Sequence, residues 1–452
     1  MGDSDVIARA KEKQRERLAL YEMTRLKTDI SVAVPTVDSE VKAQLRIYGE
    51  PVCLFGEDVF DRRERLKVLI ATQPRPKKME EEKEVKREAV QTETFFTIGS
   101  TDLLSARRII ANDSRARSSA RLAIERSSDP GPSSSTEYWD SPDVVSTSQV
   151  GDSRPLTAIA LCPFTTAVAV AGWSGDINVF STLGSNEPML SLKGHQDRCC
   201  SIAWTSEANA SVHLVSGGSD HSVRLWSLSD NGREVGSLEG HEMRVNRVAV
   251  HPHLNRFVAS TSDDETWRLW DIEKRTEVLL QEGHVSEVFG LCFHPDGSLV
   301  GTSDTAGVIR VWDLRTGRSI LGFDREHVEQ VIGLDFSLNG YLLASCSADN
   351  SVRVFDLRKK MRIETLTAHT KLVSSVKFGG QRGDTLMTAG YDCVARIWRT
   401  SDFKIVKNLP LHETRIMSAD MSRDGRTVAT ACYDRTFKLW ANSSQSLKME
   451  IA

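Results

Sequence analysis

Residues 240–271, GHEMRVNRVAVHPHLNRFVASTSDDETWRLWD, decide the fold because the second half of the chain repeats this stretch. The repeat opens with Gly-His and closes with an aromatic residue. The histidines recur 42 to 46 residues apart, at His195, His241, His284, His327, His369 and His412. The closing aromatic residues are Trp226, Trp270, Trp312, Phe355, Trp398 and Trp440. A motif that recurs in register at this period is typical of a repeat protein.

Each repeat also predicts four strands, since short apolar runs alternate with turn clusters such as His-Pro and Asp-Asp. A repeat of this length with a Gly-His opening and a Trp-Asp closing resembles the WD40 family of β-propellers. One more unit of the same pattern, residues 154–181, precedes the first Gly-His. We therefore expect a mainly β protein with a seven-bladed WD40 β-propeller over residues 154–452.

The repeated histidines are each followed by a Ser or Thr and then an Asp, which invites a catalytic interpretation. A triad used once indicates catalysis, whereas a triad used in blade after blade indicates architecture. The WD40 resemblance implies the second: a buried hydrogen-bonded network that stabilises each blade. The complete predicted sets are His195, Ser216, Asp220 and Trp226; His241, Ser260, Asp264 and Trp270; His369, Thr388, Asp392 and Trp398; and His412, Thr430, Asp434 and Trp440.

Three blades depart from this pattern. The fourth has Ala306 at the Asp position, the fifth has Phe355 in place of the Trp, and the first has Val170 and Ser174 at the corresponding positions. We expect these blades to depend more on packing than on the network.

Composition and motifs argue against an enzyme. The chain has 58 basic and 62 acidic residues and eight cysteines without a CxxC pair. It contains no phosphate-binding loop motif and no metal-ligand spacing. Its start is charged rather than apolar, and its most apolar stretch is interrupted by Pro163, so we expect neither a signal peptide nor a membrane span. We expect no catalytic residues, cofactor, metal or small-molecule substrate.

The region before the propeller divides by composition. We expect a basic, partly disordered segment at 1–33, two short helices at 34–70, a charged linker at 71–99, an arginine-rich helix at 100–127 and a Ser/Pro-rich linker at 128–153. Thr36 is the expected N-cap of the first short helix. Helices this short are unstable alone, so we expect Leu45 and Leu66 to face a partner protein. The alternative is that the helices pack on each other or on the propeller rim.

Residues 34–70, VPTVDSEVKAQLRIYGEPVCLFGEDVFDRRERLKVLI, resemble the motif that precedes the propeller in the WD40 subunit of the U4/U6 small nuclear ribonucleoprotein (snRNP), the pre-mRNA-processing factor four family. The resemblance implies a nuclear, non-enzymatic scaffold of the U4/U6 snRNP and the U4/U6.U5 tri-snRNP. The implied partners are the pre-mRNA-processing factor three protein, cyclophilin H and U4/U6 snRNA. A generic WD40 adaptor, such as a ubiquitin-ligase substrate receptor or a chromatin reader, is the alternative, and it has no need of this motif.

Two further surfaces are expected to bind partners. The arginines of the helical segment should lie near snRNA phosphate, unless the helix is merely solvated: Arg107, Arg108, Arg115, Arg117 and Arg121. The residue before each network Asp should be exposed on one face of the ring, which gathers Trp173, Tyr391 and Tyr433 on adjacent blades, with Arg154, Arg198 and Arg415 at the rim. The alternative is that these aromatics plug the central channel.

The seventh blade needs an outer strand. Either residues 144–150 or the tail at 446–451 can supply it, and we favour the former because pairing of the two chain ends locks the ring.

Overall fold

A computed structural model describes residues 34–35, 37–52, 57–72, 100–127, 138–140 and 144–442, apart from short gaps at 183–186, 208–209, 230–231, 325, 381–382 and 411. The described residues fall into two compact units, one within residues 1–93 and the other within residues 94–452. The expected basic segment 1–33, nearly all of the linker at 71–99, half of the linker at 128–153 and the C-terminal tail lie outside the described residues.

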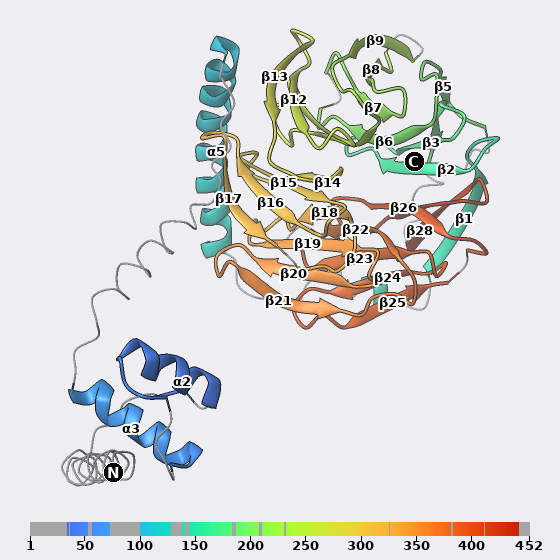
Figure 1. Cartoon of the computed structure of the whole chain (residues 1–452). Helices are drawn as coiled ribbons and strands as arrows, with labels where there is room; N and C mark the ends of the chain where they lie inside the picture. The colour runs from blue at the N-terminus through green and yellow to red at the C-terminus, as the bar shows by residue number, and fades with distance from the viewer. Residues whose placement is uncertain are drawn as a thin grey trace, which may run out of the picture. The chain divides into compact units, whose positions relative to one another are not determined.

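The second unit is a propeller of seven four-stranded antiparallel sheets around a central axis, which confirms the predicted fold (Figure 1). Blade one consists of β2 (Leu156–Leu161), β3 (Ala167–Gly172), β4 (Ile177–Ser181) and β5 (Leu190–Leu192). Blade two consists of β6 (Cys199–Trp204), β7 (Leu214–Gly218), β8 (Val223–Ser227) and β9 (Arg233–Leu238). Blade three consists of β10 (Val245–Val250), β11 (Phe257–Ser262), β12 (Trp267–Asp271) and β13 (Thr276–Gln281). Blade four consists of β14 (Val288–Phe293), β15 (Leu299–Asp304), β16 (Ile309–Asp313) and β17 (Arg318–Phe323).

The remaining blades follow the same order. Blade five consists of β18 (Val331–Phe336), β19 (Leu342–Ser347), β20 (Val352–Asp356) and β21 (Met361–Leu366). Blade six consists of β22 (Val373–Gly379), β23 (Thr385–Gly390), β24 (Ala395–Arg399) and β25 (Ile405–Leu409). Blade seven consists of β26 (Ile416–Met421), β27 (Val428–Cys432), β28 (Thr436–Asn442) and, from the other end of the chain, β1 (Val144–Val150).

The core lies between the blades. Middle strands such as β3 and β11 are buried along their whole length, because each is covered on both faces by a neighbouring blade. The innermost strands of all seven blades surround a central cavity of about 900 Å³. Because each blade is covered only by its neighbours, a single blade has no stable core of its own.

Residues 144–150 supply the outer strand of blade seven, which confirms the prediction that we favoured. β1 pairs antiparallel with β28, from Val144 opposite Asn442 to Val150 opposite Thr436. The propeller therefore begins before residue 154, because the predicted linker contains one of its strands. Pairing the two chain ends leaves blade seven with a full set of four strands.

Two side chains that the sequence analysis missed reinforce this closure. Trp139 is fully buried and donates its indole N–H to the carbonyl of Gly425 at 2.7 Å. The carboxylate of Asp420 in blade seven accepts the backbone N–H of Leu161 in blade one at 2.8 Å. Both bonds join the beginning of the propeller to its end.

The arginine-rich segment forms one helix, α5 (Thr101–Ser127), along the outer edge of the propeller beside β13 and β17 (Figure 1). Its Leu103, Ala106 and Ile110 are buried in one cluster with side chains of blades three and four. The apolar face of this helix thus docks on the same chain.

The first unit is a pair of helices, α2 (Asp38–Ile47) and α3 (Val59–Thr72). Leu45 and Leu66 are fully buried in a cluster that the two helices share with Val41 and Leu69. The expectation that Leu45 and Leu66 face a partner is therefore wrong, because the two apolar faces cover each other. The residue at the N-cap of α2 is Val37, not Thr36, and it caps without a side-chain hydrogen bond.

Ion pairs complete this helical pair. The buried guanidinium of Arg65 binds both carboxylate oxygens of Glu57, at 2.7 and 3.0 Å, and the carbonyl of Pro51 at 2.9 Å. Arg62 on α3 pairs with Asp38 on α2 at 2.5 Å. These bonds satisfy buried charges, which a marginal two-helix unit needs. No described helix in the chain is long and apolar enough to cross a membrane.

Candidate functional site

The histidine networks have the predicted geometry in blades two, three and six. In blade three, His241 contacts the carboxylate of Asp264 at 2.8 Å and the hydroxyl of Ser260 at 2.7 Å, and the indole of Trp270 donates to the same hydroxyl at 2.8 Å. The corresponding contacts in blade two join His195, Asp220, Ser216 and Trp226, and those in blade six join His369, Asp392, Thr388 and Trp398. Each histidine is buried.

The electrostatics of these networks favour charged carboxylates. Burial alone raises the pKa of Asp264, but hydrogen bonds from His241 and Thr266 outweigh it and hold the pKa well below the usual range. The pKa of Asp220 is lowered against the same opposing effect of burial, by His195 and Ser222. A buried hydroxyl that already accepts an indole N–H is poorly placed to attack a substrate. The arrangement therefore stabilises the blade.

Blade four corrects the sequence analysis. Ala306 is exposed, and Asp304, two residues earlier, reaches the imidazole of His284 at 3.0 Å and accepts the backbone N–H of Val308 at 2.8 Å. Thr302 and Trp312 complete the network. The blade is not deficient, because Asp304 lies two residues after Thr302 on β15 and therefore points to the same side of the strand.

Blades five and one depart as predicted. In blade five, His327 keeps its contacts to Asp349 and Ser345, while Phe355 is fully buried against Phe323, with ring centroids 4.4 Å apart. Blade one has no histidine network, and the hydroxyl of Ser174 there binds the carboxylate of Asp152.

Blade seven departs unexpectedly. His412 contacts the hydroxyl of Thr430 at 2.7 Å, and Trp440 donates to that hydroxyl at 3.1 Å. Nδ1 of His412 has no hydrogen-bond partner among the described residues, so the predicted contact with Asp434 is missing.

The structure brings together the predicted aromatic residues. We call Trp173, Tyr391, Tyr433 and Arg415 the aromatic patch. The rings of Trp173 and Tyr433 meet edge to face, with centroids 6.0 Å apart. Arg415 lies over Tyr433 at 4.0 Å and over Tyr391 at 5.3 Å, so it stands between the tyrosines rather than at the rim.

The repeat register explains why these residues lie together. In every blade the residue at this position donates its backbone N–H to the turn before the innermost strand, for example Trp173 to Pro155, Tyr391 to Leu372 and Tyr433 to Arg415. None of the three aromatics is among the described residues that line the central cavity, which argues against the channel-plug alternative.

A hollow of about 410 Å³ adjoins Trp173. It is lined by Arg154, Arg198, Arg244, Asp197 and Ser219. Arg198 donates to the hydroxyl of Ser219 at 2.9 Å. Arg244 was not predicted, although it occupies the same place in blade three that Arg198 occupies in blade two. Arg244 pairs with Asp263 at 2.5 Å, so the positive charge that favours an anionic partner comes from Arg154 and Arg198, offset in part by Asp197.

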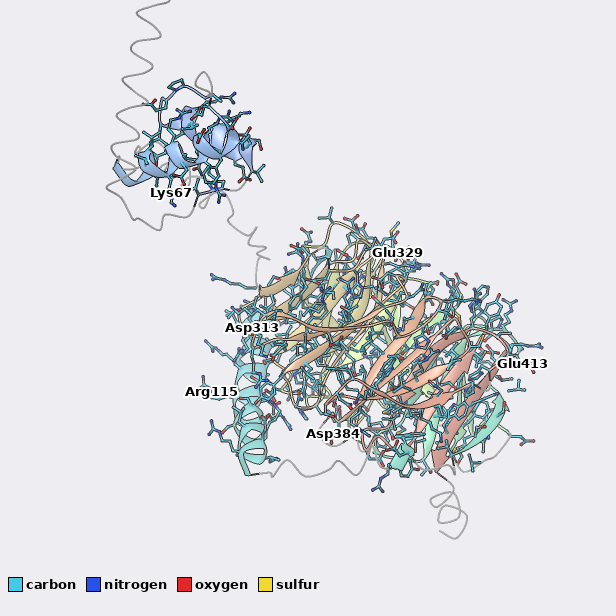
Figure 2. All side chains as sticks on the ribbon, turned by 90° about the horizontal axis from the view of Figure 1, so that it is seen from below. Lys67, Arg115, Asp313, Glu329, Asp384 and Glu413 are labelled. Atoms are coloured by element: carbon cyan, nitrogen blue, oxygen red, sulfur yellow. The ribbon has the colours of Figure 1, made fainter. Side chains whose placement is uncertain are left out.

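The five predicted RNA-proximal arginines lie in different surroundings. Arg108 and Arg115 are exposed, and Figure 2 shows Arg115 on the side of α5 away from the sheets. Arg107 lies against the turn at Gly317, and Arg117 pairs with Asp113 on the same helix at 2.9 Å.

Arg121 differs from the expectation that these arginines lie near snRNA phosphate. Its guanidinium binds both carboxylate oxygens of Asp296, at 2.9 and 2.8 Å, and also contacts the carbonyl of Asn339. This arginine holds α5 on the propeller, so its charge is directed at protein rather than at RNA.

Two family models match the chain. Residues 155–444 match the model described as IFT122 first beta-propeller. Residues 41–69 match the model for pre-mRNA processing factor 4 (PRP4) like proteins. The second match covers most of the α2–α3 unit, including Leu45 and Leu66.

Several curated proteins are similar over long stretches. The U4/U6 small nuclear ribonucleoprotein PRP4 of Saccharomyces cerevisiae is 31% identical over 424 residues, covering 90% of each chain. The PRP4-like protein of Arabidopsis thaliana is 36% identical over 448 residues, covering 95% of this chain and 80% of its own. U4/U6 small nuclear ribonucleoprotein Prp4 of Homo sapiens is 40% identical over 212 residues, covering 44% of this chain and 40% of its own.

By fold, the chain is a seven-bladed β-propeller protein of the WD-repeat class. The long matches extend across the helical unit as well as the propeller. The chain belongs to the PRP4 family of U4/U6 small nuclear ribonucleoprotein proteins.

Proposed function

We propose that this protein is a non-enzymatic scaffold subunit of the U4/U6 snRNP and the U4/U6.U5 tri-snRNP, acting in pre-mRNA splicing in the nucleus. The observation that carries the proposal is the family match over residues 41–69 together with relatives that cover both units. A generic WD40 adaptor needs a propeller but not this helical unit. The partners we propose are the pre-mRNA-processing factor three protein, cyclophilin H and U4/U6 snRNA.

Affinity purification of the tagged full chain from nuclear extract, followed by sequencing of bound RNA, tests this proposal. We expect U4 and U6 snRNA to be strongly enriched over other small RNAs. Recovery of ubiquitin-ligase or chromatin subunits without these RNAs would favour the adaptor alternative.

The aromatic patch is the proposed protein-binding surface of the propeller. Tyr and Trp supply large contact areas at low entropic cost, and Trp173 is 37% exposed. The adjacent arginines favour a partner segment that carries acidic side chains.

Alanine at Trp173, Tyr391 and Tyr433 together tests the patch. We expect the variant to fold and to lose snRNP proteins in the same purification. The matched control replaces Met243, Val285 and Val328, exposed apolar residues of blades three to five, with alanine. Equal recovery from both variants would remove the patch from the proposal.

The exposed side of α5 is the proposed RNA-proximal surface. Arg108 and Arg115 present charge to solvent, while the buried side of the helix fixes their position on the propeller. We expect the double change Arg108→Glu and Arg115→Glu to reduce RNA crosslinks within residues 103–128 of the assembled particle. Absence of any crosslink there in the unaltered protein would eliminate this surface.

A further inference from the structure

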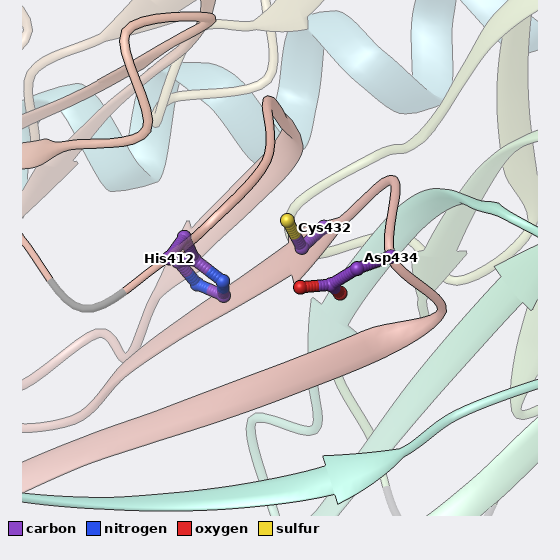
Figure 3. A group of neighbouring side chains, drawn as sticks. All are labelled: His412, Cys432 and Asp434. Atoms are coloured by element: carbon purple, nitrogen blue, oxygen red, sulfur yellow. The ribbon is translucent and has the colours of Figure 1, made fainter.

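Blade seven contains a cluster of three potential metal ligands that the described residues of the other blades lack. Figure 3 shows His412, Cys432 and Asp434 around a common space. One ligand atom from each residue, a ring nitrogen, the thiol sulfur and a carboxylate oxygen, lies within 4.8 Å of the other two. It is the one such cluster of three or more among the described residues.

The imidazole of His412 is buried, with 6% of the residue exposed, yet its Nδ1 lacks a hydrogen-bond partner among the described residues. In blades two to six the same nitrogen contacts a carboxylate at 2.8 to 3.0 Å. An unpaired buried nitrogen costs free energy. Among the described network histidines of blades two to seven, His412 is therefore the one whose Nδ1 is available to a ligand.

Comparison of the blades shows what Cys432 does. Ser262 in blade three and Ser347 in blade five occupy its position, and their hydroxyls bind the carbonyls of Met243 and Glu329 at 3.2 Å. Sγ of Cys432 makes the matching contact to Thr414 at 3.2 Å. Among the described residues of blades two to seven, the contact between His and Asp is missing only in blade seven, where this position holds a sulfur.

We propose that His412 Nδ1, Cys432 Sγ and the Asp434 carboxylate bind one zinc-class divalent ion, with water as the fourth ligand. Nitrogen, sulfur and carboxylate oxygen form a donor set that Zn²⁺ accepts in tetrahedral sites. Bond lengths of about 2.0 to 2.3 Å require the side chains to draw closer than they lie here. Cys432 releases its proton to solvent on binding, so thiolate, carboxylate, neutral imidazole and Zn²⁺ sum to zero charge.

The surroundings support the three ligands. With the metal on Nδ1, the Nε2–H of His412 donates to the hydroxyl of Thr430, which fixes the ring and its tautomer. The hydroxyl of Thr414, 2.9 Å from Sγ, can donate to the thiolate. An imidazole binds a metal ion in its neutral form, and the contact of Nε2 with Thr430 leaves Nδ1 to face the other two ligands.

Spectroscopic titration of the metal-free full chain with Co²⁺, followed by competition with Zn²⁺, tests the site. We expect one equivalent of Co²⁺ to produce a thiolate-to-cobalt charge-transfer band and tetrahedral d–d bands, which Zn²⁺ then abolishes. We also expect Zn²⁺ to raise the melting temperature. Absence of the charge-transfer band at saturating Co²⁺ overturns the proposal.

Cys432→Ser is the informative variant, because blades three and five fold with serine at this position. It should lose the charge-transfer band and weaken Zn²⁺ binding at least about tenfold, while its metal-free melting temperature stays equal or rises. Cys432→Gly reproduces Gly218 and Gly390 of blades two and six and serves if the serine variant misfolds.

Cys393→Ser is the matched control, since Cys393 lies in the equivalent turn of blade six, where His369 keeps its carboxylate. The control should bind Co²⁺ like the unaltered protein. A band that persists in both Cys432 variants would show that another thiol binds the metal and would overturn the assignment.

Discussion

At the scale of single residues, a carboxylate can reach the buried imidazole from two different positions of the repeat. Asp264 does so from the turn after β11, whereas Asp304 does so from the end of β15 itself. Both place an oxygen against Nδ1. Two positions in each blade can therefore complete the network, and the chain uses both.

Asp304→Ala tests this equivalence. The change leaves Nδ1 of His284 and the backbone N–H of Val308 without the carboxylate, so we expect unfolding to become easier by about 1–3 kcal/mol. Thermal denaturation should show a lower melting temperature. The control Thr305→Ala should melt like the unaltered protein, and equal melting of the Asp304 variant would show that Asp304 contributes nothing.

A second residue-scale prediction concerns acid stability. His251 accepts the backbone N–H of Leu254 at Nδ1, 3.0 Å away, and binds the carbonyl of Gly297 through Nε2, also at 3.0 Å, so the ring must be neutral. Burial lowers its pKa to about 4, and burial lowers the pKa of the similarly placed His294. The unfolded chain has the ordinary value near 6.5 and therefore takes up the proton first as pH falls. We expect stability to decline from about pH 6.5 and to keep declining towards pH 4.

Calorimetry at pH 7, 6 and 5 measures this decline. The melting temperature of His251→Gln should fall less over that pH range than the melting temperature of the unaltered protein. His221→Asn, at an exposed histidine, should lose as much. If the His251 variant shows the full pH dependence, its imidazole is not the group responsible.

Sequence reasoning reached the blade register and the aromatic patch because both depend on positions within a repeat. It missed Asp304 because the motif assigns the carboxylate to one position only. The unpaired nitrogen of His412 could not be predicted either. The spacing places His412 and Asp434 at network positions, but it does not fix the distance between their side chains.

At the scale of elements, the fate of an amphipathic helix depends on which apolar surface it meets. The sequence shows one apolar side on each of the three helices but not its partner. α5 meets blades three and four, while α2 and α3 meet each other. Contacts between elements far apart in the chain leave no local trace in the sequence, so Leu45 and Leu66 were assigned to a surface when they belong to a core.

Leu45→Asp should therefore unfold the helical pair while the propeller stays intact. A buried charge without a partner is costly, and this unit has only a small apolar cluster to offset it. Hydrogen exchange read by mass spectrometry should show lost protection in residues 38–47 and 59–72, with unchanged protection in the blades.

Phe60→Asp is the control for that experiment, because Phe60 on α3 is 64% exposed. We expect this variant to keep its hydrogen-exchange protection in both helices. If it nevertheless loses snRNP proteins in the affinity purification, the exposed side of α3 binds a partner. Retained protection in Leu45→Asp would contradict the packing of α2 on α3.

At the scale of the whole molecule, a propeller is stable only as a closed ring. Closure here depends on residues from opposite ends of the domain: β1 on β28, Asp420 on Leu161 and Trp139 on Gly425. The segment before residue 154 is therefore a structural part of blade seven, despite its Ser-rich composition.

Two N-terminal truncations test closure by comparison. A chain that starts at residue 128 retains Trp139 and β1, whereas a chain that starts at residue 151 lacks both and exposes the edge of β28. We expect the shorter chain to melt at least about 3 °C lower, since a loss of about 2 kcal/mol shifts the midpoint of a domain of about 300 residues by roughly that much. Its unpaired edge should also promote self-association, measurable by light scattering.

Removal of residues 444–452 from the longer chain should leave both the melting temperature and the self-association unchanged, because β28 already has its partner in β1. A large destabilisation on that deletion, or equal melting of the two truncations, would show that closure does not depend on β1.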